Sequence, residues 1–232
     1  AAHTLQIGFA VSRHVADEPS LICALVGMAI GNIMLERLEE AVQQPDAPSF
    51  YWPLTDLPRQ FIDLRKPMEG ERVSAYGSFP GAAEMAADLN AKPWPPEKVQ
   101  ALAQVLRQLQ DQNNQLLEVR DEAEMLLRMA ARHEASKKLL IAEGRPKELV
   151  DAMPHLQVAL LVSLRQYDRT FDEMLKWQGL PYREARPGME KVEQRLKETA
   201  DNKDAPAIPL ARLLLPAVQK VFGARTRTDR RI

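Results

Sequence analysis

The stretch from Glu97 to Glu143 constrains the fold most strongly, because it contains neither Gly nor Pro. The other 185 or so positions hold all 17 prolines and all 10 glycines of the 232-residue chain. Pro96 precedes the stretch and Gly144 follows it, and this asymmetry is typical of helix ends. Apolar residues recur inside it at steps of three and four: Leu102, Val105, Leu109, then Leu116, Val119, Ala123, Leu126 and Ala130. This spacing predicts amphipathic helix.

The weakest helical point of this stretch is the segment DQNNQ at 111–115. Asp and Asn favour caps and turns because their side chains compete for backbone hydrogen bonds. We therefore predict an antiparallel pair of helices at 97–110 and 115–142. By the same criteria, further helices are predicted at 4–16, 20–44, from 146, 154–178, 181–200 (interrupted by Pro187-Gly188) and 210–222.

Since no stretch shows the sustained two-residue alternation of strands, the predicted class is all-α. We expect an antiparallel helical bundle or a helical-hairpin array with a Pro- and aromatic-rich loop packed on it. It would form a single domain, 1–232, with a possible subdivision into 1–92 and 93–232. Residues 5–16 and 20–42 look like one helical hairpin in the tetratricopeptide style. No second copy follows at a fixed spacing, so the sequence does not support an array.

The most apolar segment is LICALVGMAIGNIML, which starts at Leu21. Its apolar core of about 15 residues is shorter than the ~20 that a membrane span requires, and acidic residues flank both ends. A buried core helix is therefore predicted, with no integral membrane segment; peripheral membrane association is the alternative. Gly27 and Gly31 lie four residues apart, which predicts close packing against a neighbouring helix.

The composition argues against several function classes. A net charge of -1 gives no general attraction to nucleic acid, although four arginines lie in the last eight residues. The four histidines are scattered, and the single Cys23 lies among apolar residues, so neither a metal site nor a thiol nucleophile is indicated. The chain contains no glycine-rich phosphate loop and no nucleophile elbow. No catalytic residue and no cofactor are predicted.

The best candidate site lies in the Pro-rich segment 45–67, where five prolines exclude a long helix. Loops held on rigid helices often carry binding sites, and aromatic residues beside arginine suit ligand or peptide contacts. The alternative is that the aromatic side chains fill the core and the charged ones pair with each other. The predicted ligand-binding or partner-binding residues are Tyr51, Trp52, Asp56, Arg59, Asp63 and Arg65.

Four longer motifs carry a resemblance: FYWPLTDLPRQFIDLR, LVDAMPHLQVALL, WQGLPYREARPG and LARLLLPAVQKV. Through them the chain resembles a family of long bacterial helical proteins of unknown function that look exported. The resemblance covers most of the chain and has no assigned chemistry. It implies that these residues are the middle of a longer polypeptide, and that the cell envelope or periplasm is the location, with the cytoplasm as the alternative.

Many amphipathic helices without a catalytic motif favour a non-catalytic protein-interaction or scaffold domain. Its partner would be another protein or the remainder of its own longer chain, and not nucleic acid. The alternative is a small-molecule binder or a hydrolase-like enzyme with its site between the 45–67 loop and the central helices.

Overall fold

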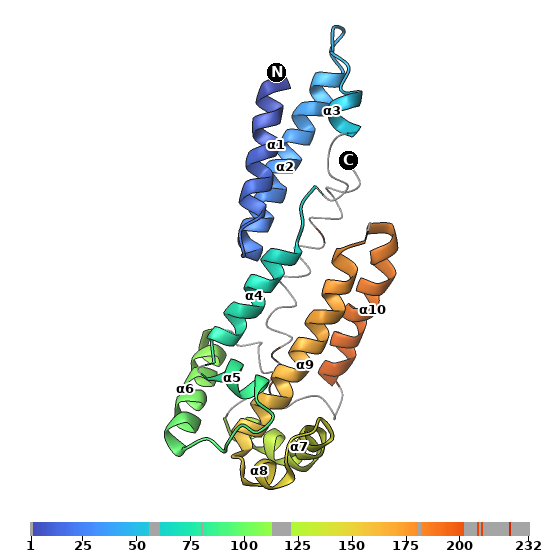
Figure 1. The fold of residues 1–232 in the computed structure, drawn as a ribbon. Helices are drawn as coiled ribbons and strands as arrows, with labels where there is room; N and C mark the ends of the chain where they lie inside the picture. Colours follow the sequence, from blue (N-terminus) through green and yellow to red (C-terminus); the bar gives the residue numbers. More distant parts are fainter. Residues whose placement is uncertain are drawn as a thin grey trace. The chain divides into compact units, whose positions relative to one another are not determined.

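A computed structural model of the chain describes residues 2–55, 61–79, 81–112, 122–180, 182–201, 208, 210 and 223. The described residues form helices and connecting loops without any strand, which confirms the all-α class (Figure 1). They divide into two compact units. The described residues of 1–73 and 175–189 belong to the first unit, and those of 74–174 and 190–215 to the second. The predicted single domain stays a prediction.

The first unit is built on a hairpin of α1 (Ala2–Ala16) and α2 (Leu21–Val42), which confirms the first two predicted helices. Their backbones approach closely where the sequence places glycine. A Cβ atom at Gly27 would lie 2.6 Å from the carbonyl oxygen of Ser12 and 2.6 Å from the Cβ of Ala16. The Ser12 hydroxyl, which is buried, donates a 2.7 Å hydrogen bond to the Gly27 carbonyl. The prediction of close packing is therefore confirmed.

Two shorter helices follow, α3 (Tyr51–Thr55) and α4 (Arg65–Gly77). The start of α4 contacts the turn between α1 and α2. Glu71 of α4 accepts a 3.1 Å hydrogen bond from the backbone N–H of Leu21, one of the donors that a helix N-terminus leaves without a helical partner. Gly70 lets α4 approach, since a Cβ there would lie 1.9 Å from the Pro19 carbonyl oxygen.

The second unit contains α5 (Ala82–Ala87), α6 (Pro96–Gln112), α7 (Glu122–Ala142), α8 (Lys147–Ala152) and most of α9 (His155–Gln178). The apolar run that starts α9 is buried on nearly all sides: Leu156, Val158, Ala159, Leu160, Leu161 and Leu164 are each at most 9% exposed. This helix therefore occupies the centre of the unit, as expected for a helix with a nearly continuous apolar run.

The central stretch of the sequence forms α6 and α7, and the predicted break at 111–115 lies mostly outside the described residues. The predicted end at Gly144 is confirmed. Gly144 has a left-handed backbone with φ 96°, and its N–H donates to the Ile141 carbonyl at 3.0 Å. The N–H of Arg145 donates to the Leu140 carbonyl at 3.2 Å. These two bonds form a Schellman motif, which ends α7.

The last helix, α10 (Tyr182–Asp201), corrects one prediction, because it passes through Pro187-Gly188 without interruption. Packing gives the physical reason. The indole ring of Trp177 lies against Gly188 so closely that a Cβ at this glycine would be 2.1 Å from a ring carbon. Packing of that half-buried ring against α10 offsets the single helical hydrogen bond that Pro187 cannot donate. The helix predicted at 210–222 lies almost entirely outside the described residues.

Candidate functional site

The two predicted aromatic residues of the site, Tyr51 and Trp52, lie on the surface of the first unit. Their side chains are 63% and 72% exposed, and their rings meet edge to face with centroids 5.2 Å apart. The alternative that these aromatic side chains fill the core does not hold. They belong to α3, which has only five residues and so presents them at one place on the surface.

The predicted charged residues of the site are paired in part. The Arg65 guanidinium donates to both carboxylate oxygens of Asp63, and the Arg65 backbone N–H donates to the same carboxylate at 3.0 Å. The hydrogen bonds to Asp63, and then the negative charge of that carboxylate, raise the pKa of Arg65. Asp56 and Arg59 lie outside the described residues. The site predicted between the 45–67 loop and the central helices involves both units and stays a prediction.

Asp63 also lines a hollow of about 430 Å³ in the first unit, which lies within the range of small-molecule sites. The end of α1 forms one wall, and the segment before α4 forms the other. The lining residues are Ala10, Arg13, His14, Ala16, Asp17, Phe61, Ile62 and Asp63.

The apolar part of the hollow is anchored in the core of the unit. Phe61 and Ile62 are only 5% and 8% exposed, and the ring of Phe61 meets that of Phe9 edge to face at 5.5 Å. Phe61 also lies above Gly31, where a Cβ would be 3.3 Å from the ring. The wall is therefore held by packing on both α1 and α2.

The polar part of the hollow contains charges of both signs. The Asp17 carboxylate accepts a 2.8 Å hydrogen bond from the Lys66 ammonium, which raises the pKa of Lys66. Asp63 has its own partner in Arg65. Arg13, in contrast, has neither an ion pair nor a side-chain hydrogen bond among the residues that the structure describes.

Sequence reasoning missed Arg13, His14 and Asp17 as members of a site. They lie about 50 residues before Asp63, in a helix whose apolar face was sufficient to explain its pattern. A signal was present: Arg13 and His14 lie in the last turn of α1, with Asp17 one turn after Arg13. That spacing puts Arg13 and Asp17 on one side of the chain as the helix ends.

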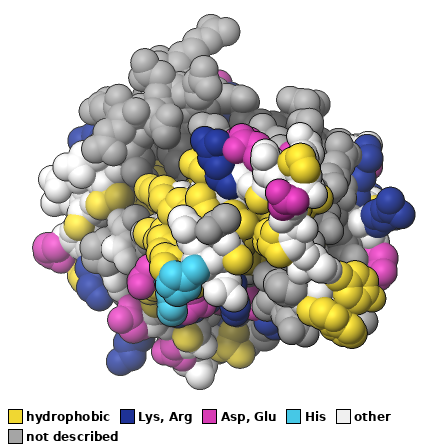
Figure 2. All heavy atoms as spheres, turned by 90° about the horizontal axis from the view of Figure 1, so that it is seen from above, with side chains coloured by type: hydrophobic (Ala, Val, Ile, Leu, Met, Phe, Trp, Pro, Cys, Tyr) yellow, Lys and Arg dark blue, Asp and Glu magenta, His cyan; other side chains and the backbone are white. Residues whose placement is uncertain are grey.

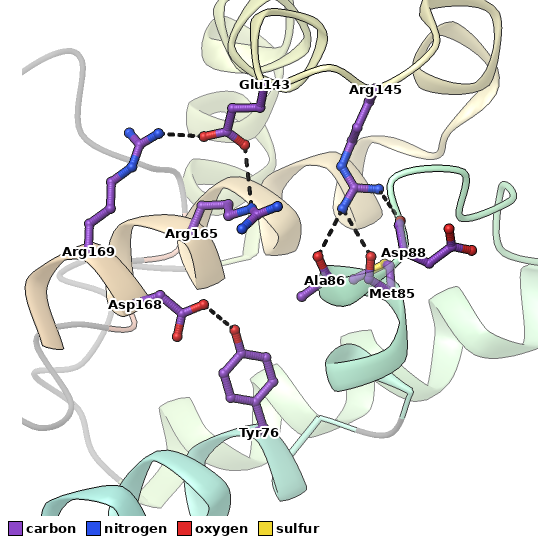
Figure 3. A network of polar contacts seen from close by, with 9 residues as sticks. All are labelled: Tyr76, Met85, Ala86, Asp88, Glu143, Arg145, Arg165, Asp168 and Arg169. Carbon is purple, nitrogen blue, oxygen red and sulfur yellow. Dashed lines mark hydrogen bonds and ion pairs between the residues drawn. The ribbon is translucent and has the colours of Figure 1, made fainter. Parts of the chain in front are cut away.

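A second arrangement of polar groups lies in the second unit, and it links helices to one another (Figure 3). Arg145 is only 2% exposed, and its guanidinium donates to the carbonyls of Met85, Ala86 and Asp88 at 3.0, 3.4 and 2.8 Å. These carbonyls lie at the end of α5, where helical partners are missing. Burial is the main cause that lowers the pKa of Arg145, followed by the charge of Arg165.

Glu143 connects α7 to α9 in the same region (Figure 3). Arg169 donates to it at 2.6 Å, and the Nε of Arg165 lies 3.5 Å from its other oxygen. Asp168, also on α9, accepts a 2.6 Å hydrogen bond from the Tyr76 hydroxyl of α4. Because these charges are paired with each other or with backbone, we interpret the arrangement as a structural junction.

Two further polar groups of the second unit have structural partners. Gln157 is fully buried. Its side-chain carbonyl accepts from the backbone N–H of Trp94 at 2.8 Å, and its side-chain amide donates to the Lys92 carbonyl at 3.1 Å. The rings of His133 and His155 are stacked at 3.8 Å. The pKa of His133 is lowered first by burial, then by the charge of His155. Within the described ranges, no three His, Cys, Asp or Glu side chains come together as metal ligands would.

The exposed side of α2 is unusually apolar. Ile22, Val26 and Ile33 are 71%, 46% and 50% exposed, and they follow the spacing of one helical face. The buried side of the same helix contains Leu21, Ala24, Met28 and Leu35. The predicted core helix is thus buried on one side only. Figure 2 shows that hydrophobic side chains also reach the surface among charged ones on the face that it draws.

By length and composition alone, α2 is long and apolar enough to cross a membrane. The core helix of a soluble protein can have the same length and composition. Comparisons with known proteins add no family: no protein-family model, no curated protein and no solved structure matches the chain.

Proposed function

We propose that this chain is a non-catalytic protein-interaction domain that docks an amphipathic helix of another protein on the exposed face of α2. The observation that supports it is the stripe of Ile22, Val26 and Ile33, with Ala29 between them. Exposed apolar stripes on soluble proteins mark interaction sites, and an apolar helix face is the usual counterpart of another one.

The length of the stripe fits a helical partner. Ile22 and Ile33 are 11 residues apart, which corresponds to about 16 Å along a helix axis at 1.5 Å per residue. This is about three turns, the length over which two helices commonly pack. Ile7 and Val11 of α1 are also 51% and 44% exposed, so the hairpin offers further apolar surface.

Charge favours a basic protein helix over a lipid surface. The exposed side of α2 continues after Ile33 into Glu36, Glu39 and Glu40, against one Arg37, which is paired with Glu40. Helices that lie on membranes carry Lys and Arg on the polar side, because natural membranes are often anionic. The acidic end therefore matches a partner helix with an apolar stripe and basic residues beside it.

The proposal is tested with two synthetic peptides of identical composition, rich in Leu and Lys. In the first, the leucines align on one helical face; in the second, their order is scrambled. We expect the chain to bind the aligned peptide at least about tenfold more tightly in fluorescence anisotropy. Burial of each isoleucine contributes about 1.5–3 kcal/mol, so the double variant Ile22→Asp/Ile33→Asp should weaken binding more than tenfold.

Val73→Asp is the matched control, because Val73 is 72% exposed on α4 and lies outside the stripe. It should leave peptide binding unchanged, and all variants should keep their melting temperatures because the substituted side chains are solvent-exposed. Equal affinity for the two peptides, or an equal loss with Val73→Asp, would contradict the proposal. Flotation with lipid vesicles but no preference between peptides would instead indicate peripheral membrane association.

The remainder of a longer chain is the second partner that the sequence predicts. If it covers α2, amide hydrogens of Leu21–Val42 exchange more slowly in the longer polypeptide than in this segment. The envelope location is proposed from the resemblance alone, and a fusion to a reporter that is active only after export tests it.

A further inference from the structure

We propose that the hollow between the end of α1 and Phe61–Asp63 binds a small organic carboxylate with an aromatic or branched apolar body. This inference does not depend on the docking proposal, because none of Ile22, Val26 and Ile33 lines the hollow.

The balance of charges around the hollow selects an anion. Its two carboxylates already have basic partners, Lys66 for Asp17 and Arg65 for Asp63. Arg13 is left with its guanidinium unused among the described residues, and His14 beside it adds a further hydrogen-bond donor. Among the described lining residues, Arg13 is therefore the charged group that has no counter-ion.

A carboxylate is the anion that suits this arrangement best. A guanidinium presents two parallel N–H groups that match the two oxygens of a carboxylate, and such bidentate pairs are stronger than neutral hydrogen bonds. A phosphate would bring two negative charges close to Asp17 and Asp63, which raises the repulsion. A single negative charge matches Arg13, which is the one arginine among the described lining residues.

The apolar residues that line the hollow determine what chemistry is expected for the rest of the ligand. Phe61 and Ile62 are buried by the core, and Ala10 and Ala16 add small apolar walls that leave space free. Burial of an apolar ligand body against these residues supplies the non-directional part of the affinity. A charged or strongly polar body would lose water there without gaining partners.

The experiment compares an acid with its neutral amide. 3-Phenylpropionate and 3-phenylpropanamide have the same shape and differ in the charge that Arg13 would bind. The hollow is open and the ligand is small, so we expect the acid to bind with Kd on the order of 1 mM, and the amide at least about tenfold more weakly. Chemical shift changes of backbone amides in the protein report both affinities and place the ligand.

Three variants locate the binding. Arg13→Gln should reduce the affinity for the acid to that for the amide, whereas Arg37→Gln, an exposed arginine of α2 outside the hollow, should leave both unchanged. Ala10→Phe, at an exposed position of α1, should fill the space and remove binding of the acid while Arg13 is intact.

Equal binding of acid and amide overturns the inference, as does an equal loss with Arg37→Gln. Failure of the acid to saturate its shifts at concentrations about tenfold above the expected Kd also overturns it. Chemical shift changes confined to residues outside α1 and 61–66 would place the acid at another site, and this result would also overturn the inference.

Discussion

The two units of this chain stabilise their helices by different means. In the first, α1 and α2 pack through small residues, Ser12 and Ala16 against Gly27, and leave apolar side chains on the outside. In the second, α9 is buried among the other helices, and the buried polar groups Arg145 and Gln157 bond to backbone of distant segments.

The difference concerns how each core is held, because exposed apolar side chains occur in both units: Leu126, Leu127 and Leu139 of α7 are 54%, 70% and 51% exposed. Polar groups inside the second unit hold it together, because each bonds to atoms that would otherwise lack partners. The hairpin of the first unit uses one side of α2 for internal packing and presents the other side to solvent. An exposed apolar face is suited to an external partner, and the first unit presents such a face on α2.

The sharpest test of the second unit is Arg145→Ala. It removes a buried guanidinium and leaves three carbonyls at the end of α5 without their donors. We expect a loss of about 3 kcal/mol in the free energy of unfolding, measured by chemical denaturation. Arg169→Gln is the control, since Arg169 is 71% exposed and its pair with Glu143 should contribute less than about 1 kcal/mol. Similar losses in both variants would remove the distinction between a buried junction and a surface pair.

The corresponding test of the first unit is Gly27→Ala. Alanine favours helix over glycine by about 1 kcal/mol, but here its Cβ would meet the Ser12 carbonyl oxygen at 2.6 Å. The helices must separate, which weakens the hydrogen bond from Ser12 to Gly27, so we expect a net loss of about 1–3 kcal/mol. In thermal melts, Gly77→Ala should be neutral or stabilising, because nothing lies within 4 Å of a Cβ at Gly77. A stabilising Gly27→Ala would refute close packing of the hairpin.

The smallest expected effect concerns acid sensitivity in the second unit. Burial and then the charge of His155 lower the pKa of His133, with Lys137 acting in the same direction and Glu134 in the opposite one. The unfolded chain therefore binds this proton first, and stability falls as the pH drops below the ordinary histidine value of 6.5. His155→Gln should reduce that fall between about pH 7.5 and 5.5, whereas His14→Gln, at an exposed position of α1, should not. An unchanged pH dependence in His155→Gln would show that burial alone sets the effect.

The sequence was sufficient for most of the described helices and for the end of α7. Local patterns determine both, since apolar spacing reports a buried face and Gly144 has the backbone conformation that a Schellman motif requires. It was misleading at Pro187-Gly188, where local propensity predicted an interruption. The contact that stabilises the helix there involves Trp177, a residue of another helix, and propensity does not include such contacts.

For the site, the sequence identified surface residues but not their neighbours. Asp63 and Arg65 were found from their own segment, and the structure shows that they pair. Arg13 and Asp17 join them only because α1 and the segment before α4 come together in the fold, which no local pattern encodes. The exposed side of α2 was missed for another reason: a helix that is apolar on all sides gives no periodicity to tell the buried face from the exposed one.

Glu143 and Arg145 lie on either side of Gly144. Their side chains bond to residues at very different distances along the chain. Glu143 and Arg169 are 26 residues apart, whereas Arg145 and Asp88 are 57 apart. Closing the longer loop costs roughly 0.7 kcal/mol more chain entropy. The contacts of these residues with α9 can therefore form before those with α5, so that α7 and α9 supply a partly assembled surface onto which the earlier part of the unit folds.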